Sequence, residues 1–232
     1  MKKFFLANLY KRVINLVFHP FYSMNIKPLA FDIKENDKCL ILAPHPDDES
    51  IGCGGIMSLY PKNFKVICLT HGDDERRNEF ENAMKYLNVE HEILNFKDKH
   101  ISENYDEFSK IDFRDFNHIF IPYIYDQHND HKAISLLLNK YLKNNKLQNN
   151  LKIVFYEVWS TMNMPNYFVD ISSVVENKKA AINCHVSQIN DKDYATKILG
   201  LNEYRGMIKN IGFAETFTVL DKKDFMNIMK EV

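Results

Sequence analysis

The sequence lacks the features that mark a disulfide-bonded or nucleic-acid-binding protein. Its 30 basic and 31 acidic side chains nearly cancel, and this balance argues against nucleic acid as the partner. The four cysteines include no Cys-x-x-Cys pair, and Cys39 and Cys68 lie within apolar strand patterns, which is typical of buried thiols in a reducing compartment. We therefore expect a cytoplasmic protein. Its 232 residues suffice for one domain with a substantial core.

The first 31 residues contain no acidic side chain, which separates them from the rest of the chain. Their apolar stretches are too short to span a bilayer, and Lys11 and Arg12 interrupt what would otherwise be a signal-peptide core. Two interpretations remain open. A basic amphipathic helix here either lies on an anionic membrane surface, at the inner face of the membrane, or packs on its own domain or on a second subunit of a homo-oligomer. We predict an N-terminal segment, residues 1–31, and a domain, residues 32–232.

From Lys38 onward, apolar strand patterns alternate with helical patterns. No periodicity is evident in the polar stretch that ends at Asp115. The alternation predicts an α/β fold in a single domain, with a Rossmann-like, mostly parallel sheet and helices on both faces. In such sheets ligands bind beyond the carboxyl ends of the strands, where the strand order reverses. Strands are predicted at 38–43, 64–70, 90–96, 118–123 and 152–159, and helices at 51–60, 74–87, 132–143, 174–185 and 191–207.

The first of these strands ends in the run Pro-His-Pro-Asp-Asp-Glu, residues 44–49. The two prolines restrict the backbone on both sides of His45, so the turn is rigid and presents His45, Asp47 and Asp48 at the strand end. Three adjacent carboxylates repel one another unless a cation lies among them. Imidazole together with carboxylate suits zinc. We expect the third carboxylate, Glu49, to support the metal site or cap the following helix rather than bind the metal.

A second polar loop, which ends in His128-Asn129-Asp130-His131, follows the strand at 118–123 and precedes a helix. Because His45 and Asp48 alone would hold a metal weakly, the site needs another nitrogen ligand. His131, at the helix start, can supply it. Three protein ligands leave one coordination position open for water, which is the arrangement of a catalytic zinc site.

Together the two motifs resemble the PIG-L/LmbE-like family of zinc-dependent de-N-acetylases, which includes N-acetylglucosaminyl-phosphatidylinositol deacetylase. The segment 179–188 resembles the family's late Lys…His-x-Ser-Gln pattern, and the resemblance extends from about Lys38 to about Glu215. It implies a zinc-dependent hydrolase that removes the N-acetyl group of an amino sugar, either free or linked to a nucleotide, a lipid or a glycan. The products are acetate and a free amine.

The resemblance also assigns a role to each residue of the two motifs. The Zn²⁺ ligands are then His45, Asp48 and His131. The general base that deprotonates the attacking water is Asp47. Protonated His128 holds the tetrahedral oxyanion, and Asp130 orients that imidazole and favours its charged form. Either Asp47 or His128 then protonates the leaving amine.

Substrate contacts are less closely defined by the sequence. The resemblance implies that Arg76, or the adjacent Arg77, binds substrate, and the position of His71 at a strand's carboxyl end makes it a candidate for a second contact. Asn129 stands where the family commonly has proline, yet every chemically necessary group is present, so we expect an active enzyme. Two alternatives remain open: a zinc amidohydrolase that acts on another N-acylated metabolite, and a non-catalytic, metal-bound module that contacts a membrane or a partner.

Overall fold

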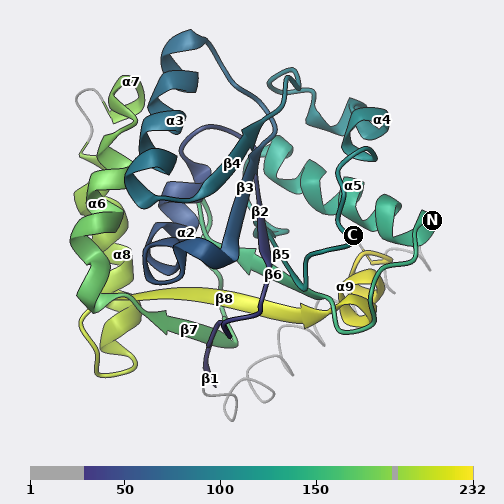
Figure 1. Cartoon of the computed structure of the whole chain (residues 1–232). Helices are drawn as coiled ribbons and strands as arrows, with labels where there is room; N and C mark the ends of the chain where they lie inside the picture. The colour runs from purple at the N-terminus through teal and green to yellow at the C-terminus, as the bar shows by residue number, and fades with distance from the viewer. Residues whose placement is uncertain (1–28, 190–192, 232) are drawn as a thin grey trace, which may run out of the picture.

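A computed structural model describes residues 29–189 and 193–231, which form one sheet between two layers of helices (Figure 1). Its elements are β1 (Leu29–Ala30), β2 (Cys39–Ala43), α2 (Asp48–Leu59), β3 (Phe64–Cys68), α3 (Asp74–Leu87), β4 (Glu90–Ile93), α4 (Tyr105–Phe108), β5 (His118–Pro122), α5 (Asn129–Asn144), β6 (Lys152–Tyr156), β7 (Tyr167–Asp170), α6 (Val175–Asn183), α7 (Val186–Ile189), α8 (Tyr194–Met207), β8 (Ala214–Asp221) and α9 (Lys222–Ile228).

The predicted N-terminal segment lies outside the described residues except for its last three positions, so both interpretations of it stay predictions. Within the described ranges, none of the helices combines the length and apolar content needed to cross a bilayer.

The strand order places the carboxyl ends of β2 and β5 side by side. In the described residues the sheet has eight strands in the order β1-β7-β8-β6-β5-β2-β3-β4. The chain runs outward from β2 through β3 to β4 and then returns to begin the other half at β5, so the strand order reverses between β2 and β5. Neighbouring strands are parallel except that β8 is antiparallel to β6 and β7. The predicted α/β domain with a mostly parallel sheet is confirmed.

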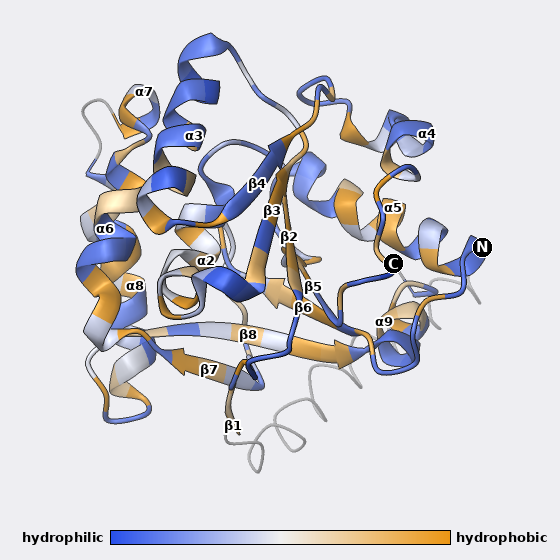
Figure 2. Ribbon diagram, in the orientation of Figure 1, coloured by the Kyte–Doolittle hydropathy of each residue, from blue (hydrophilic) through white to orange (hydrophobic). Residues whose placement is uncertain are grey.

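The sheet is buried on both faces because its strands alternate side chains between two hydrophobic clusters. On β2, Leu40 and Leu42 pack in the cluster that includes Ile134 and Leu138 of α5. The intervening side chain of Ile41 packs in the other cluster, with residues of α2 and α3. In Figure 1, α5 and α9 cover one face of the sheet, while α2, α3, α6 and α8 cover the other. Figure 2 shows the central strands as mainly hydrophobic and much of α3 as hydrophilic.

Two glycines allow α2 to approach the sheet closely. A Cβ atom at Gly52 would lie 2.2 Å from the Tyr156 ring of β6, and one at Gly55 would lie 2.5 Å from the Ile171 side chain. The Tyr156 hydroxyl donates a hydrogen bond of 2.9 Å to the carbonyl oxygen of Leu42, near the end of β2. These contacts fix the position of α2, and with it the loop that joins β2 to α2.

Candidate active site

The loop between β2 and α2 carries Asp47 in an uncommon backbone conformation. Its φ is 125° and its ψ is −30°, a region in which a residue other than glycine is strained by about 1–3 kcal/mol. The Asp47 amide donates to Oε2 of Glu49 at 3.2 Å. At the start of the loop, the Pro44 carbonyl accepts from the amide of Thr70 at 3.1 Å and from its hydroxyl at 2.9 Å. The loop is therefore fixed by contacts at both of its ends.

One carboxylate oxygen of Asp48 lies between two imidazoles. Its Oδ2 is 3.2 Å from Nδ1 of His45 and 3.3 Å from Nε2 of His131. All three side chains are buried. The structure thus brings together the three residues predicted as metal ligands: His45 from the loop after β2, Asp48 from the first turn of α2 and His131 from the first turn of α5.

The same residues fit a divalent cation. Among the described residues, neither Oδ1 of Asp48 nor Nε2 of His131 has a hydrogen-bond partner, although both atoms are buried. Unpaired buried polar atoms are costly in free energy, whereas carboxylate oxygens and imidazole nitrogens are metal ligands. One ring nitrogen each of His45, His128 and His131 also lies within 4.8 Å of the others. The cluster is therefore suited to hold a metal ion.

Charge interactions at these residues are strong. Burial and the Asp48 carboxylate raise the pKa of Asp47 to about 7, even though His185 and Arg76 act in the opposite direction. Burial alone would lower the pKa of His131, but the Asp48 and Asp126 carboxylates outweigh it and raise that pKa to about 10. The two imidazoles beside Asp48 likewise outweigh the effect of burial and hold the pKa of that carboxyl well below its ordinary value. Asp48 is thus ionised and Asp47 is near its titration midpoint at neutral pH.

His128, in the second loop, is the N-terminal cap of α5. Its Nδ1 accepts a hydrogen bond of 3.2 Å from the amide of Asp130. Its ring lies edge-on to that of His45, with 4.8 Å between centroids. Burial and the neighbouring charges on His45 and His131 lower the pKa of His128, which favours the neutral imidazole.

The carboxylate of Asp130 has a different position from the one predicted. Its Oδ2 accepts from the amide of Lys99 at 2.7 Å and lies 3.2 Å from Nε2 of His45. The expected carboxylate contact that orients His128 is replaced by the backbone contact from the Asp130 amide. The reason is that the chain after β4 and the His45 ring already engage this carboxylate.

Asp126, for which no role was predicted, supports His131. Its Oδ1 lies 3.3 Å from Nδ1 of His131 and accepts from the amide of His128 at 2.9 Å, while its Oδ2 accepts from the amides of Trp159 and Ser160 at 3.0 and 3.1 Å. Metal-binding histidines usually have such a carboxylate on the remote nitrogen. The available signal was its place two residues before His128.

Asp98 also reaches the cluster. Its Oδ1 lies 3.1 Å from Nε2 of His45, and its side chain is half exposed. It follows β4 in the stretch without periodicity, so its only sequence signal is a position beyond the carboxyl end of a strand. Together with His45 and Asp130 it forms a second group whose ligand atoms lie within 4.8 Å of one another.

The two residues predicted to bind substrate lie in different surroundings. Nη2 of Arg76 donates to the Pro46 carbonyl at 2.9 Å. The same nitrogen lies 3.7 Å from Oδ2 of Asp47. His71 instead contacts Asn95, with 2.7 Å between Nε2 and Oδ1. The structure thus brings Arg76 to the first loop and pairs His71 with the segment after β4.

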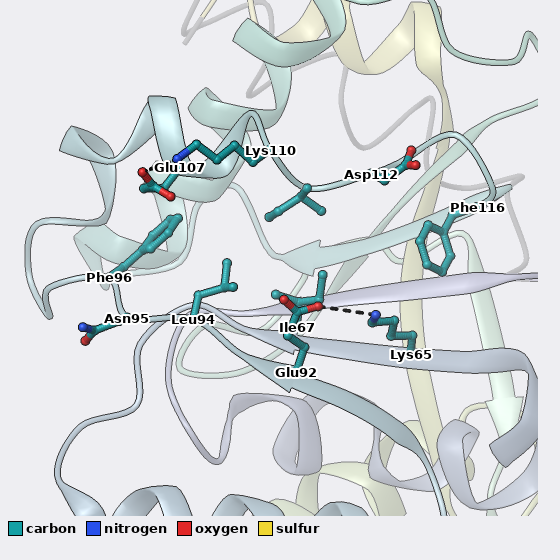
Figure 3. Close-up of a pocket in the computed structure, with 11 residues that line it drawn as sticks. Lys65, Ile67, Glu92, Leu94, Asn95, Phe96, Glu107, Lys110, Asp112 and Phe116 are labelled. Carbon is teal, nitrogen blue, oxygen red and sulfur yellow. Dashed lines mark hydrogen bonds and ion pairs between the residues drawn. The ribbon is translucent and has the colours of Figure 1, made fainter.

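A separate cavity of about 440 Å³ lies between β3, β4 and the region of α4 (Figure 3). Four of its charged groups form two pairs within the lining: Lys65 lies 3.4 Å from Glu92, and Lys110 lies 2.6 Å from Glu107. None of the predicted ligands or catalytic residues lines it. This cavity is therefore not the site that the two loops form.

Comparison with known proteins gives a family for the part of the chain that contains both loops. The model of the family described as GlcNAc-PI de-N-acetylase (PIG-L) matches residues 40–142. None of the curated proteins matches the chain. The resemblance predicted from the two motifs is confirmed by the family match.

Solved structures share the fold. An N,N'-diacetylchitobiose deacetylase from Pyrococcus horikoshii superimposes with a TM-score of 0.67 at 22% identity, covering 93% of this chain and 92% of its own. A conserved protein from Thermus thermophilus superimposes with a TM-score of 0.66 at 22% identity, covering 78% of this chain and 93% of its own. At this identity the likeness shows the fold alone.

Proposed function

We propose that this chain, whose residues 40–142 belong to the PIG-L family, is a zinc-dependent N-deacetylase of an amino sugar. The observation that carries the proposal is the convergence of Asp48 with His45 and His131 directly beside Asp47. The proposed site lies at the carboxyl edge of the sheet where the strand order reverses, which is where sheets of this kind bind ligands.

In this proposal Zn²⁺ is held by His45, Asp48 and His131. When bound, zinc supplies a Lewis acid that polarises the acetamide carbonyl and lowers the pKa of water. Asp48 would supply one carboxylate ligand, and His45 and His131 would supply two imidazole ligands, a set that is common for catalytic zinc. Oδ1 of Asp126 lies 3.3 Å from Nδ1 of His131, on the side of the ring away from Nε2, so that Nε2 remains available to the cation.

Asp47 is the proposed general base. Its carboxylate takes a proton from the attacking water, and a pKa near neutrality suits a group that must accept a proton and later release it. The Arg76 guanidinium lies 3.7 Å from this carboxylate and moderates its pKa. The adjacent carboxylate of Asp48 is committed to the cation, so Asp47 remains the free acceptor.

His128 is the proposed donor to the oxyanion that forms on the acetyl group. Since Nδ1 of His128 accepts from a backbone amide, a neutral ring carries its proton on Nε2, which is then free to donate. The amine leaves as a neutral group after receiving a proton from Asp47 or His128. In this arrangement Asp130 acts on His45 rather than on His128.

The proposed substrate is an N-acetylated amino sugar. The family description, GlcNAc-PI de-N-acetylase, and the chitobiose deacetylase with the same fold both support this class. Arg76, beside Asp47, is the proposed substrate-binding cation, with His71 as a more distant contact. A lipid-linked form of the sugar would suit a membrane-bound helix in residues 1–31.

The test is acetate release by the purified full chain. Free acetamido sugars, acetylated chitobiose, nucleotide-linked sugars and polyprenyl-linked sugars serve as substrates, with bound metal measured in the same preparations. We expect acetate from at least one sugar, its loss on chelation and its return with added zinc. A zinc-loaded chain that releases no acetate from any of them would contradict the proposal.

A further inference from the structure

We propose that Glu49 and His185 are positioning residues that hold the Asp47 backbone in its strained conformation and so place its carboxylate for catalysis. The inference rests on the proposed function of Asp47 as the base. Neither Glu49 nor His185 belongs to the proposed ligand set.

The Glu49 carboxylate makes the contact that holds the Asp47 backbone. This carboxylate is completely buried in the first turn of α2. Oε2 accepts from the Asp47 amide at 3.2 Å, and Oε1 accepts from the Ser50 hydroxyl at 2.7 Å. The amide that Glu49 holds belongs to the one residue of this loop with a positive φ. Without that acceptor, the buried Asp47 amide would lose its partner, and the backbone could relax toward an ordinary φ.

His185 reaches the same carboxylate from a distant part of the chain. It lies between α6 and α7, is buried, and places Nε2 3.4 Å from Oε1 of Glu49 and 3.4 Å from Oγ of Ser50. The imidazole therefore limits the positions that the Glu49 carboxylate can take. Removal of the imidazole would leave Oε1 of this buried carboxylate with the Ser50 hydroxyl as its remaining donor, which is costly in free energy.

The segment that carries His185 is itself anchored on α3. Ser187 donates to Glu79 twice, from its amide at 2.6 Å and from its hydroxyl at 2.7 Å. The chain of contacts thus runs from α3 through Ser187 to His185, then to Glu49 and to the amide of Asp47. It connects the late segment, which the sequence motif singled out, to the catalytic loop.

Two consequences separate this role from simple packing. His185 is not in the predicted ligand set of His45, Asp48 and His131, so its removal should leave zinc bound. The displaced group is a catalytic carboxylate, and small displacements of such groups lower the rate of the chemical step more than the affinity for substrate. The expected signature is a lower kcat at unchanged KM and unchanged zinc content.

The experiment compares His185→Ala, His185→Gln and Glu49→Gln in the zinc-loaded full chain. We expect His185→Ala and Glu49→Gln to lower kcat by about tenfold to a hundredfold, with KM and zinc content within twofold of the unmodified protein. Glutamine at position 185 can still donate an N–H to Glu49, so His185→Gln should recover most of the lost kcat. His100→Ala, which removes a partly exposed imidazole paired with Glu103 and lies outside this chain of contacts, is the control and should retain full kcat.

A crystal structure of His185→Ala supplies a readout that needs no turnover. A shift of the Asp47 φ to negative values would support the proposal, and an Asp47 that keeps its φ near 125° would overturn it. An unchanged kcat in both His185→Ala and Glu49→Gln would also overturn it. If the unmodified protein releases no acetate, the proposed function fails, while the crystal structure still decides whether His185 holds the loop.

Discussion

The loops after β2 and β5 differ in burial and in backbone conformation. The loop after β2 and the start of α2 are buried: His45, Asp47, Asp48 and Glu49 are each at most 8% exposed. The loop after β5 is only partly buried: Ile124 and Asp126 are buried, whereas Tyr125 is 62% exposed. The first loop is rigid and strained, whereas the second is an ordinary helix N-terminus with an exposed approach.

This difference suggests a division of labour. The buried loop and the start of α2 hold the proposed base and two proposed ligands, groups whose positions must not vary. The open loop supplies the third ligand and, through Asp126, is tied to the segment that bears Trp159, which is 44% exposed. Exposed loops set specificity in many enzymes, so we expect substrate selection on this side of the site.

Removal of His131 should have the largest effect, because His131 is the proposed metal ligand that the second loop supplies. His131→Ala leaves only His45 and Asp48 to hold a cation, and we expect loss of bound zinc together with loss of measurable acetate release. Metal content and turnover check this. His100→Ala is the matched control, since His100 is a partly exposed histidine whose imidazole lies 2.8 Å from the Glu103 carboxylate. Retention of a full complement of zinc by His131→Ala would contradict the ligand assignment.

A smaller effect is expected when only the oxyanion donor of the second loop is removed. In His128→Asn, asparagine can still cap α5, so the helix start should persist. We expect kcat to fall by about a hundredfold to a thousandfold, with zinc content unchanged. Parallel measurement of kcat and metal content distinguishes two roles: if zinc is lost as well, His128 is a metal ligand and the proposed assignment is wrong.

The smallest effect should come from the support behind His131. Asp126→Asn keeps the shape of the side chain but removes the charge that faces Nδ1 of His131. We expect the affinity for zinc to fall by about tenfold to a hundredfold, while kcat at saturating zinc stays close to that of the unmodified protein. A zinc titration monitored by activity measures both quantities. An unchanged affinity for zinc would show that Asp126 does not support the metal site.

The parts of the fold that follow local rules were predictable. Strands β2, β3, β5 and β6 are short apolar runs, and the alternation of strands with helices indicated a parallel sheet with loops at its carboxyl edge. The strand β8 was missed because its sequence includes Glu215, Thr216 and Thr218. The buried Glu215 is compatible with the core only because Lys178 and two amides of α2 contact it, and such distant partners leave no local pattern.

The same limit applies to the site. The ligand and base candidates could be named because their motifs are contiguous, and helix α2 starts three residues earlier than predicted because its first turn contains acidic residues of that motif. Asp98 and Asp126 lie in loops whose contacts depend on tertiary structure. Asp130 could be placed in the second loop, but the direction of its carboxylate is set by the Lys99 amide and the His45 ring.

The central claim is that Asp47 acts as the base without serving as a ligand, and Asp47→Asn tests it most directly. Asparagine adopts positive φ more readily than most residues, so the loop conformation should persist while the proton acceptor is lost. The measurement is acetate release per bound zinc on the best substrate. We predict a full complement of zinc and a kcat lower by about a thousandfold. A zinc-loaded Asp47→Asn chain that turns over at the rate of the unmodified protein would contradict the account.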